Sequence, residues 1–509
     1  MPEKIPTKLK GKRILIFQQR NWGVNTGHRL AKKLQAEGCL LAALTLKKST
    51  HEFIANEQKE VNYDLIINND EIMSRPKDYL AGDRFTLEQV CDDLGVDSIW
   101  PLVATMRNHV RSYKDKYFYS FKQNVPDEEI IDYILAFYKC IKVVFEKFNP
   151  DVIIAPNFVA LPHIMFNLYM EKHGKRMIAV TDCKISGIYI FTFGYRDDHG
   201  PFYDRLDELN EKKVVSPNLD KAKKYIAEFR QQFKKPDYAN EYISEEKLSW
   251  KRKIKRELKP YYLIFKWYTT KKLNVLESTG ITADFRPPKI ILRDHYCNKR
   301  YQKFMRNYKY YPLEKIDKFV YFPLQYQPEA NIDVVAPYFS NQIETARQIA
   351  MSLPDDYTLA VKEHPDMFGL RPPSYLEKVA RTVNVKLIDY RIPGEEVLKK
   401  CDLVICPNST TMTEAAFCWK PAIQLGDLGT TLKLPNVFRH TDMTTLAKKI
   451  KEILALNLKT EEYEKRLENY VAAAYDAGFD FDFAGAWGGG SEESFNSLWQ
   501  AYKKELSKY

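Results

Sequence analysis

Several features that define large protein classes are missing from this 509-residue chain. Its eight cysteines form no CxxC pair and no zinc-ligand spacing, so we expect reduced thiols and no structural metal. The first residues contain no apolar segment leading to a cleavage site, so we expect the cell interior rather than secretion. The most apolar window, 152–170, is interrupted by prolines and by His163, which favours a strand, a loop and a helix over a membrane span.

Repeats and nucleotide-binding fingerprints are also missing. We find no tandem repeat, and the glycine-bearing loop 20–28, RNWGVNTGH, does not contain the GxGxxG pattern of dinucleotide-binding proteins. The composition is nevertheless that of a folded protein, with 45% hydrophobic and 28% charged residues. Because single hydrophobic cores stop growing at roughly 250–300 residues, a chain of this length should form two large lobes.

The formal net charge of +11 is concentrated in one segment, residues 247–272. This segment holds ten Lys or Arg against one acid, interleaved with aromatic residues. Such a mixture suits an anionic membrane surface, a polyanionic glycan or nucleic acid, and a solvated helix face fits it equally well. No recognised nucleic-acid-binding motif accompanies the segment, so we do not expect nucleic acid as a partner.

Alternating strand and helix patterns predict two α/β lobes. The first lobe opens with a strand at 13–17, a turn at 23–27, a helix at 28–37 and a strand at 39–46, which is a βαβ unit of a parallel sheet. After the basic segment the alternation restarts near residue 318, with the short connectors of a doubly wound domain. The tail holds two helical patterns separated by AGAWGGG, flexible enough for the last helix to cross back onto the first lobe.

Three polar clusters follow strands of the second lobe, although they are far apart in sequence. They are FPLQYQPEANI at 322–332, KEHP at 362–365 and PNSTTMTEAAFCWKP at 407–421. Ligands of open α/β sheets collect at the carboxyl ends of the strands. We therefore expect the three clusters to lie together at one edge of the sheet.

The second and third clusters predict an anion site. The hydroxyl run 409–411 opens a helix, so it can bind a phosphate, although a plain N-cap explains the same residues. Glu414, one turn later, can accept hydrogen bonds from ribose hydroxyls or act as a capping-box glutamate. His364, before the rigid Pro365, can donate to a phosphate oxygen or be an ordinary histidine at a strand end.

These motifs resemble a known family. Together with LPNVFRHTD at 434–442, they are similar in order and spacing to motifs of the capsule polysaccharide synthesis family. That family includes bacterial surface-glycan glycosyltransferases of GT-B architecture, with Kdo transferases of capsule assembly among them. The resemblance covers about residues 320–445, and the first lobe is similar to the family only loosely.

The resemblance implies a nucleotide-sugar site in the second lobe. The residues it implies for donor binding are Gln325, Gln327, Lys362, His364, Pro365, Ser409, Thr410, Thr411 and Glu414. Within this set, the His-Pro pair and the Ser/Thr turn correspond to family motifs at the donor phosphate, and the QPE segment, which ends at Glu329, lines the cleft. Glu414 corresponds to the glutamate that precedes the family's GKP motif. That motif reads CWKP here, and we expect Trp419, in place of glycine, to alter the pocket floor.

Transfer also needs groups from the first lobe, because the resemblance implies that the acceptor binds there and the sugar lies between the lobes. Loop 20–28 offers Asn25 and His28 if the strand before it is central, since its glycines allow close approach to a ligand. Asp182, after the strand RMIAVT, can be a nucleophile or base, although a strand-end turn is the commoner role. The candidate catalytic residues are therefore His28, Asp182 and Glu329.

We predict a GT-B-like α/β fold with two Rossmann-like, doubly wound domains facing a cleft and a C-terminal helix crossing back to the first. The expected regions are 1–235 (acceptor domain), 236–316 (basic, aromatic-rich helical insert), 317–458 (nucleotide-sugar domain) and 459–509 (C-terminal helices). A nucleotide sugar then serves as co-substrate, with no further cofactor and no metal.

The predicted function is a nucleotide-sugar-dependent glycosyltransferase of surface polysaccharide biosynthesis, acting on a glycan or glycolipid. We expect a cytoplasmic protein whose basic segment reaches the inner face of the plasma membrane. Two alternatives stay open. One is a CDP-alcohol phosphotransferase or sugar-nucleotide epimerase of the same fold, and the other is a non-catalytic glycan-binding scaffold.

Overall fold

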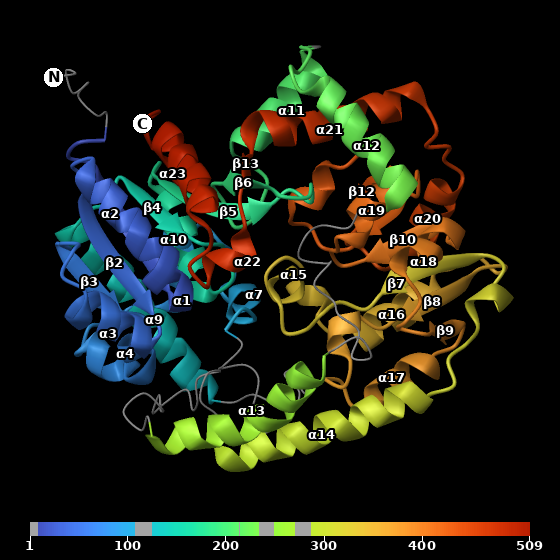
Figure 1. The fold of residues 1–509 in the computed structure, drawn as a ribbon, viewed down its shortest axis with the longest axis horizontal. Helices are drawn as coiled ribbons and strands as arrows, with labels where there is room; N and C mark the ends of the chain where they lie inside the picture. Colours follow the sequence, from blue (N-terminus) through green and yellow to red (C-terminus); the bar gives the residue numbers. More distant parts are fainter. Residues whose placement is uncertain (1–8, 107–124, 213, 234–248, 270–286) are drawn as a thin grey trace.

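Two sheets organise the computed structural model, which describes residues 9–106, 125–212, 214–233, 249–269 and 287–509 (Figure 1). The first sheet has the strand order β13-β6-β5-β4-β1-β2-β3. Strands β5 to β3 in this order are parallel, and β6 and β13 pair antiparallel at the other edge. The strands are β1 (Arg13–Gln19), β2 (Leu40–Leu46), β3 (Leu65–Asn68), β4 (Val152–Ala155), β5 (Arg176–Asp182), β6 (Ile188–Thr192) and β13 (Phe479–Asp480).

The second sheet is parallel throughout, with the order β12-β11-β10-β7-β8-β9. Its strands are β7 (Phe319–Pro323), β8 (Thr358–Lys362), β9 (Val385–Ile388), β10 (Leu403–Cys406), β11 (Ala422–Gln424) and β12 (Val437–Arg439). Strands β7, β8 and β10 are short apolar runs that are almost entirely buried, as expected for strands covered by crossover helices. The order places β10, β7 and β8 side by side, which decides where the polar clusters after them meet.

Helices cover both sheets. On and around the first sheet lie α1 (Arg20–Trp22), α2 (His28–Ala36), α3 (Lys48–Glu52), α4 (Asn69–Ser74), α5 (Pro76–Leu80), α6 (Leu87–Leu94), α7 (Trp100–Val103), α9 (Asp127–Lys147) and α10 (Leu161–Lys172), with π-helical turns η1 (Gly23–Gly27) and η2 (Phe53–Glu57). Around the second lie α15 (Ala330–Asp333), α16 (Gln342–Met351), α17 (Pro373–Ala380), α18 (Gly394–Lys400), α19 (Thr411–Phe417) and α20 (Leu446–Leu454), with 3-10 turns η6 (Leu313–Lys315), η7 (Pro337–Phe339), η8 (Pro365–Met367) and η9 (Thr430–Lys433).

The predicted turn at 23–27 is wrong, because this segment is a π-helical turn between α1 and α2. Gly23 and Gly27 have ordinary right-handed helical dihedrals, so they do not supply a turn conformation. Their role is close packing: a Cβ on Gly27 would lie 2.7 Å from the Trp22 ring, and one on Gly23 would lie 2.7 Å from the backbone of Gln18. The glycines therefore let a helix start directly after β1.

The tail connects the two sheets. Helix α21 (Glu461–Ala477) packs on α11 (Pro201–Glu211) and α12 (Leu219–Gln232), and all three share one apolar core with the second sheet. Helix α23 (Glu492–Leu506) buries Leu498, Tyr502 and Leu506 in a core with β1 and α2 of the first sheet (Figure 1). The short helix α22 (Phe483–Ala486) lies between them, so the last helix crosses back to the first domain as predicted.

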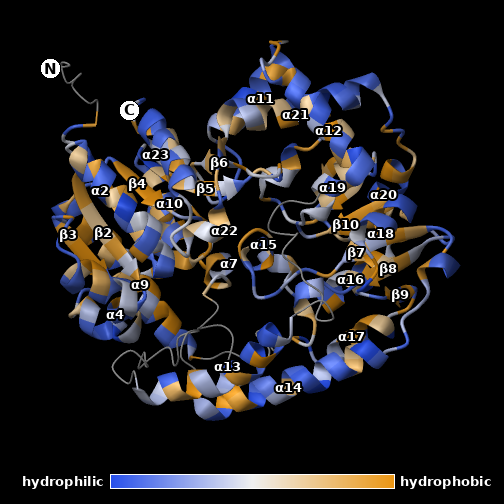
Figure 2. Ribbon diagram, in the orientation of Figure 1, coloured by the Kyte–Doolittle hydropathy of each residue, from blue (hydrophilic) through white to orange (hydrophobic). Residues whose placement is uncertain are grey.

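Helices α13 (Trp250–Thr269) and α14 (Pro288–Asn307) pack on each other, and α14 also packs on α17 (Figure 1). Helix α13 contains nearly all of the described part of the basic segment 247–272. Residues 247, 248 and 270–272 lie outside the described residues. Among the helices that the structure describes, none is long and apolar enough to cross a membrane. Figure 2 shows hydrophobic residues along both helices rather than in one continuous block.

Candidate functional site

A cleft of about 570 Å³ lies between the two domains. The first domain contributes Asp182, Lys184 and Tyr189, the crossing tail contributes Phe483, and the second domain contributes most of the remaining lining residues. All predicted site residues line this cleft except His28 and Gln327. The fold is thus the predicted GT-B-like arrangement of two α/β domains facing a cleft.

The three polar clusters meet because their strands are neighbours. In the parallel register, Pro323 at the end of β7 lies opposite Lys362 at the end of β8, and β10 flanks β7 on the other side. Chain segments that leave these three ends necessarily start at one edge of the sheet. Residues 325–329, 362–366 and 409–414 therefore form one wall of the cleft.

A buried ion pair fastens two of these segments together. The Glu363 and Arg371 side chains are fully buried, and Arg371 Nη1 donates to Glu363 Oε1 at 2.5 Å. Arg371 Nη2 donates to the backbone carbonyl of Gln325 at 2.5 Å, while the backbone N–H of His364 donates to Glu363 Oε1 at 2.7 Å. Burial raises the pKa of Glu363, and the charge of Arg371 opposes that rise. This pair therefore holds the backbone at Gln325 and at His364, in two segments of the same cleft wall.

His364 sits at the turn that this pair holds. Its side chain is 36% exposed and lies beside the ring of Tyr326, with centroids 6.0 Å apart. Nδ1 accepts a hydrogen bond of 3.2 Å from the backbone N–H of Asp366. The proton of the neutral ring is therefore on Nε2, which makes His364 Nε2 a hydrogen-bond donor.

The hydroxyl run before α19 separates into two kinds of residue. Ser409 is buried, and its Oγ accepts the backbone N–H of Thr411 at 3.2 Å, so it caps the chain turn. Thr410 is the N-cap of α19 and makes no side-chain capping bond, so Thr411 is inside the helix and is not the N-cap that a capping box with Glu414 requires. Thr410, Thr411 and Glu414 all line the cleft.

The first-domain wall carries a charged cluster around Lys184. Asp182 accepts the backbone N–H of Lys184 at 2.6 Å and its Nζ at 3.0 Å, so Asp182 is both a turn residue and a cleft residue. Burial opposes the charged form of Lys184, but Asp182, Glu329 and Asp197 outweigh it and raise the pKa of Lys184. Glu329 comes from the second domain, so the cluster joins both walls.

Asp197 belongs to the same cluster around Lys184 but does not line the cleft. Thr181 Oγ1, on the cleft side, donates to Asp197 Oδ2 at 3.2 Å. Burial raises the pKa of Asp197 from 3.8 to about 6, although Lys184 and the hydroxyl hydrogen bonds lower it in part. The cluster therefore changes its net charge near neutral pH.

Two donor-site predictions have structural roles as well. Lys362 is buried, and its Nζ donates to the carbonyl of Ile392 at 2.8 Å. Gln325 is buried, and its Nε2 donates to the carbonyl of Pro323 at 2.8 Å. Both residues border the cleft, but these bonds hold the ends of β7 and β8 in place.

Gln327 does not reach the cleft. Its Nε2 donates to the carbonyl of Ser340 at 3.0 Å, and its Oε1 accepts from Gln342 at 3.2 Å. Gln342 is buried at the start of α16 and also contacts the backbone of Gln325. The side chain of Gln327 therefore points into this amide network, because the helix after the segment offers it partners there.

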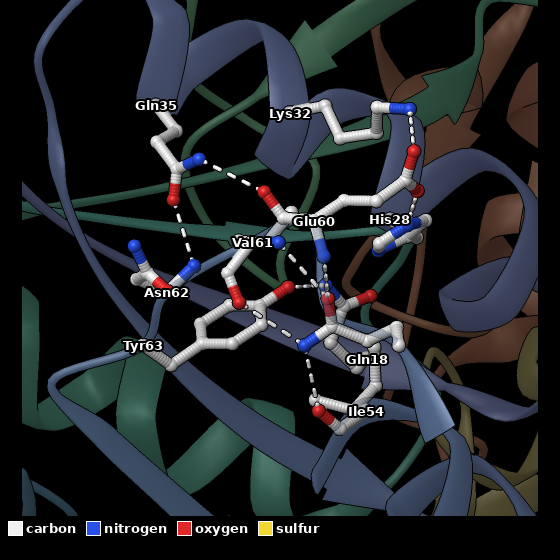
Figure 3. A network of polar contacts seen from close by, with 10 residues as sticks. Gln18, His28, Lys32, Gln35, Ile54, Glu60, Val61, Asn62 and Tyr63 are labelled. Atoms are coloured by element: carbon white, nitrogen blue, oxygen red, sulfur yellow. Dashed lines mark hydrogen bonds and ion pairs between the residues drawn. The ribbon is translucent and has the colours of Figure 1, made fainter. Parts of the chain in front are cut away.

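His28 does not reach the cleft either, although β1 is central to its sheet as expected. Figure 3 shows its side chain pointing toward Glu60, and His28 Nε2 lies 2.9 Å from Glu60 Oε2. Lys32 contacts the same carboxylate, with Nζ 2.6 Å from Oε1. The helical course of residues 20–36 turns His28 to this outer network. Asn25 instead donates to the carbonyl of Trp487 at 2.9 Å and holds the crossing tail.

Trp419 does not form the pocket floor, in contrast to our expectation. It has a φ of +54°, the left-handed region that favours glycine, and so occupies the backbone position that a glycine suits. Its ring lies under the guanidinium of Arg230, 3.7 Å from the ring centre, and its indole N–H donates to Glu464. These partners on α12 and α21 direct the side chain away from the cleft.

Sequence reasoning missed Lys184 and Arg371. Lys184 follows a strand end by two residues, the spacing of a side-chain turn, but its neighbours Glu329 and Asp197 are distant in sequence. Arg371 lies in a Pro-rich segment without a recognisable pattern. Among the residues that the structure describes, no group of three or more His, Cys, Asp or Glu side chains is placed to hold a metal ion, and all eight cysteines are free thiols.

Residues 289–428, which contain all three clusters, match the family model described as "Capsule polysaccharide biosynthesis protein". The matched segment covers 140 of the 509 residues of the chain. It includes the second-domain wall of the cleft, which supports a role in capsule polysaccharide biosynthesis. No curated protein matches the chain.

Solved structures resemble the chain only weakly. They include a beta Kdo 2,4 transferase, KpsC of Thermosulfurimonas dismutans, with 12% identity over 66% of this chain and 84% of that one and a TM-score of 0.35. A beta Kdo 2,7 transferase of the same KpsC has 13% identity over 71% and 89% and a TM-score of 0.31. A putative UDP-N-acetylglucosamine 2-epimerase of Listeria monocytogenes has 10% identity over 91% and 94% and a TM-score of 0.24. These similarities are too weak to assign a substrate or a reaction.

Proposed function

We propose that this protein is a GT-B-type glycosyltransferase of capsule polysaccharide biosynthesis that uses a nucleotide sugar. The observation that carries the proposal is the convergence of three family-region segments, 325–329, 362–366 and 409–414, with Asp182 and Lys184 of the first domain on one cleft. A transferase needs both walls, because donor and acceptor must be held in reacting distance.

The donor binds to the second-domain wall in this proposal. His364 Nε2 donates to a phosphate oxygen, and the hydroxyls of Thr410 and Thr411 add two further hydrogen-bond donors. Glu414 accepts from the ribose hydroxyls one helical turn away. The preformed pair of Glu363 and Arg371 holds the His364 turn before the donor arrives, so little reorganisation is needed when the phosphate charge develops.

Transfer breaks the bond between the sugar and the donor phosphate and forms a bond from the sugar to an acceptor hydroxyl. The nucleotide leaves with the electron pair, and the hydroxyl proton must pass to a base. Asp182 and Glu329 are the carboxylates that line the cleft near Lys184 and can take that role. Lys184 positions Asp182 through its two hydrogen bonds.

The acceptor approaches along a second groove of about 490 Å³ that shares Asp182, Tyr189, Phe483 and Ala484 with the cleft. The rings of Tyr189 and Phe483 are stacked, with centroids 5.6 Å apart, and serine and carboxylate side chains line the groove beyond them. Aromatic faces and hydroxyl-binding groups suit a sugar ring. The proposed acceptor is therefore the glycan part of a growing polysaccharide or glycolipid.

Thermal-shift titration tests the donor half of the proposal. Wild type, His364→Ala and the matched control His173→Ala, an exposed histidine of the first domain outside the cleft, are each titrated with CMP, CDP, UDP and GDP. We expect one nucleotide to raise the Tm of wild type and His173→Ala, but not that of His364→Ala. An equal rise in Tm for all three proteins would show that His364 does not contact the phosphate. No rise in Tm for any of them would favour the non-catalytic scaffold.

Product analysis tests the reaction itself. With the stabilising nucleotide's sugar donor and a polysaccharide primer, we expect a new glycosidic bond and free nucleotide, with turnover that persists in EDTA. A phosphodiester product would instead assign a phosphotransferase, and an isomerised nucleotide sugar formed without an acceptor would assign an epimerase.

A further inference from the structure

Helix α13 exposes an apolar stripe along most of its length. Its members are Trp250, Ile254, Leu258, Tyr261, Phe265 and Tyr268, each at least 50% exposed. At 3.6 residues per turn they fall within an arc of about 80° and extend over roughly 27 Å of helix. A single exposed hydrophobic residue is ordinary, but a continuous stripe of this length marks an interaction surface.

A neighbouring face of the same helix already has its partner. Pro260 is buried, and Glu257, Ile264 and Trp267 are half-buried on the side that packs on α14. There Glu257 forms an ion pair with Lys299, with Oε2 2.5 Å from Nζ. The hairpin of α13 and α14 is therefore stable without the stripe, and the stripe is left for another partner.

Cationic side chains occupy the arc next to the stripe. Helix α13 carries seven Lys or Arg and one acid, and Lys251, Lys255, Lys259 and Lys266 lie on the flank adjacent to the apolar residues by helical periodicity. Long Lys side chains can lie along apolar surface while their ammonium groups stay in water. Within the stripe, Tyr261 contacts Tyr296 of α14, which is also exposed.

We propose that α13 is an interfacial helix that docks the protein on an anionic lipid surface, with the stripe inserted among the acyl chains and the lysines at the headgroups. The combination decides between partners: a soluble polyanion would use the cations but not a stripe containing Trp250, Leu258 and Phe265, whereas an anionic bilayer uses both. Aromatic residues with polar tips, such as Tyr261 and Tyr268, suit the interface between water and lipid. No described helix can cross a membrane, so the helix would lie on the bilayer.

Vesicle flotation of the full-length protein tests this proposal. The probes are vesicles of phosphatidylcholine with and without phosphatidylglycerol. We expect wild type to bind the anionic vesicles with a strong salt dependence. The stripe variant Ile254→Ser, Leu258→Ser, Phe265→Ser should bind them at least tenfold more weakly. The lysine variant Lys251→Gln, Lys255→Gln, Lys259→Gln should also bind them more weakly than wild type. All of these positions are exposed, and unchanged Tm values would show that the variants fold.

The matched control removes exposed apolar side chains elsewhere. The control variant Met351→Ser, Val383→Ser, Leu456→Ser changes exposed positions outside α13 and should bind vesicles like wild type. The proposal is overturned if wild type does not bind anionic vesicles or if the stripe variant binds them as wild type does. It is equally overturned if the stripe variant changes only the oligomeric state, or if an anionic polysaccharide binds equally well to wild type and to the stripe variant while vesicles do not bind.

Discussion

The two walls of the cleft differ in what their polar groups contact. On the second-domain wall, Glu363 and Arg371 are buried against each other, and His364 faces the cleft from a turn that this pair already holds. On the first-domain wall, Lys184 faces the cleft itself and is surrounded by carboxylates from both domains. One wall therefore fixes positions, and the other sets charge. Removing a cation should therefore lower stability on the second-domain wall and lower turnover on the first-domain wall.

The largest effect is expected for Arg371→Met. This change leaves the Glu363 carboxylate buried without its counter-ion, which costs roughly 3–5 kcal/mol of the free energy of unfolding. Chemical denaturation measures the loss. The control is Arg381→Met, which removes an exposed arginine of the same domain. Equal stabilities of the two variants would mean that the pair does not hold the wall.

Lys184→Met is expected to act on turnover instead. Without Lys184, Asp182 loses the hydrogen bond to Nζ, and Asp182, Glu329 and Asp197 all lose the positive charge of Lys184. We expect a loss of about 10²-fold in kcat/KM, comparable to the removal of one oriented group at an active site. Because Lys184 lowers the pKa of Asp197, the pH profile should also change in the variant.

The control for Lys184→Met is Lys184→Arg, which keeps the charge and should recover part of the turnover. Nucleotide binding by thermal shift should be the same in wild type and Lys184→Met, because the proposed donor wall lies on the other domain. A loss of nucleotide binding with unchanged kcat would show that the two walls are not divided in this way.

The charge of the first wall also predicts a pH-dependent stability. The pKa of Asp197 is raised from 3.8 to about 6, so the folded protein binds this proton more tightly than the unfolded chain does. The resulting stability is fully present below pH 4 and is lost as pH rises through about 6. Relative to wild type, Asp197→Asn should gain about 2 kcal/mol between pH 4 and pH 7.

Denaturant unfolding at several pH values measures this difference. The neighbouring Asp198 provides a control of opposite sign, because its hydrogen bond with His199 lowers the pKa of Asp198. Its Asn variant should lose stability relative to wild type as pH rises to 3.8, the usual pKa of this carboxyl, and this window lies below that of Asp197. Parallel curves for wild type and Asp197→Asn would mean that this carboxyl is not perturbed in the folded protein.

The second domain could be predicted closely from sequence, whereas the first could be predicted only in part, chiefly in its opening βαβ unit. The alternation of strands and helices predicted from residue 318 onward is found, because short connectors and apolar runs define the β/α units there. In the first domain, the antiparallel β6 and β13 pair elements almost 300 residues apart, which no local pattern reveals. The segment 23–27 has the glycines of a turn, but Trp22 and Gln18 pack against them only in the folded chain.

The site followed the same division. His364, Thr410, Thr411 and Glu414 could be found because they follow strand ends in one domain, where parallel topology brings such ends together. Lys184 could not, because its significance comes from Glu329 of the other domain. His28 was misplaced because a loop after a central strand was expected, and the chain continues instead as a helix that faces Glu60.

The smallest expected effect separates position from ligand contact within a single wall. Ser409→Ala removes the acceptor of the Thr411 backbone N–H and should cost about 1 kcal/mol of stability. Thr410→Ala removes a hydroxyl that makes no capping bond, so stability should be nearly unchanged while nucleotide affinity falls. Denaturation and thermal-shift titration of both variants give the two readouts. If Thr410→Ala destabilised the protein and left nucleotide binding intact, this hydroxyl would belong to the scaffold, and the phosphate contact on this wall would rest on His364 and Thr411 alone.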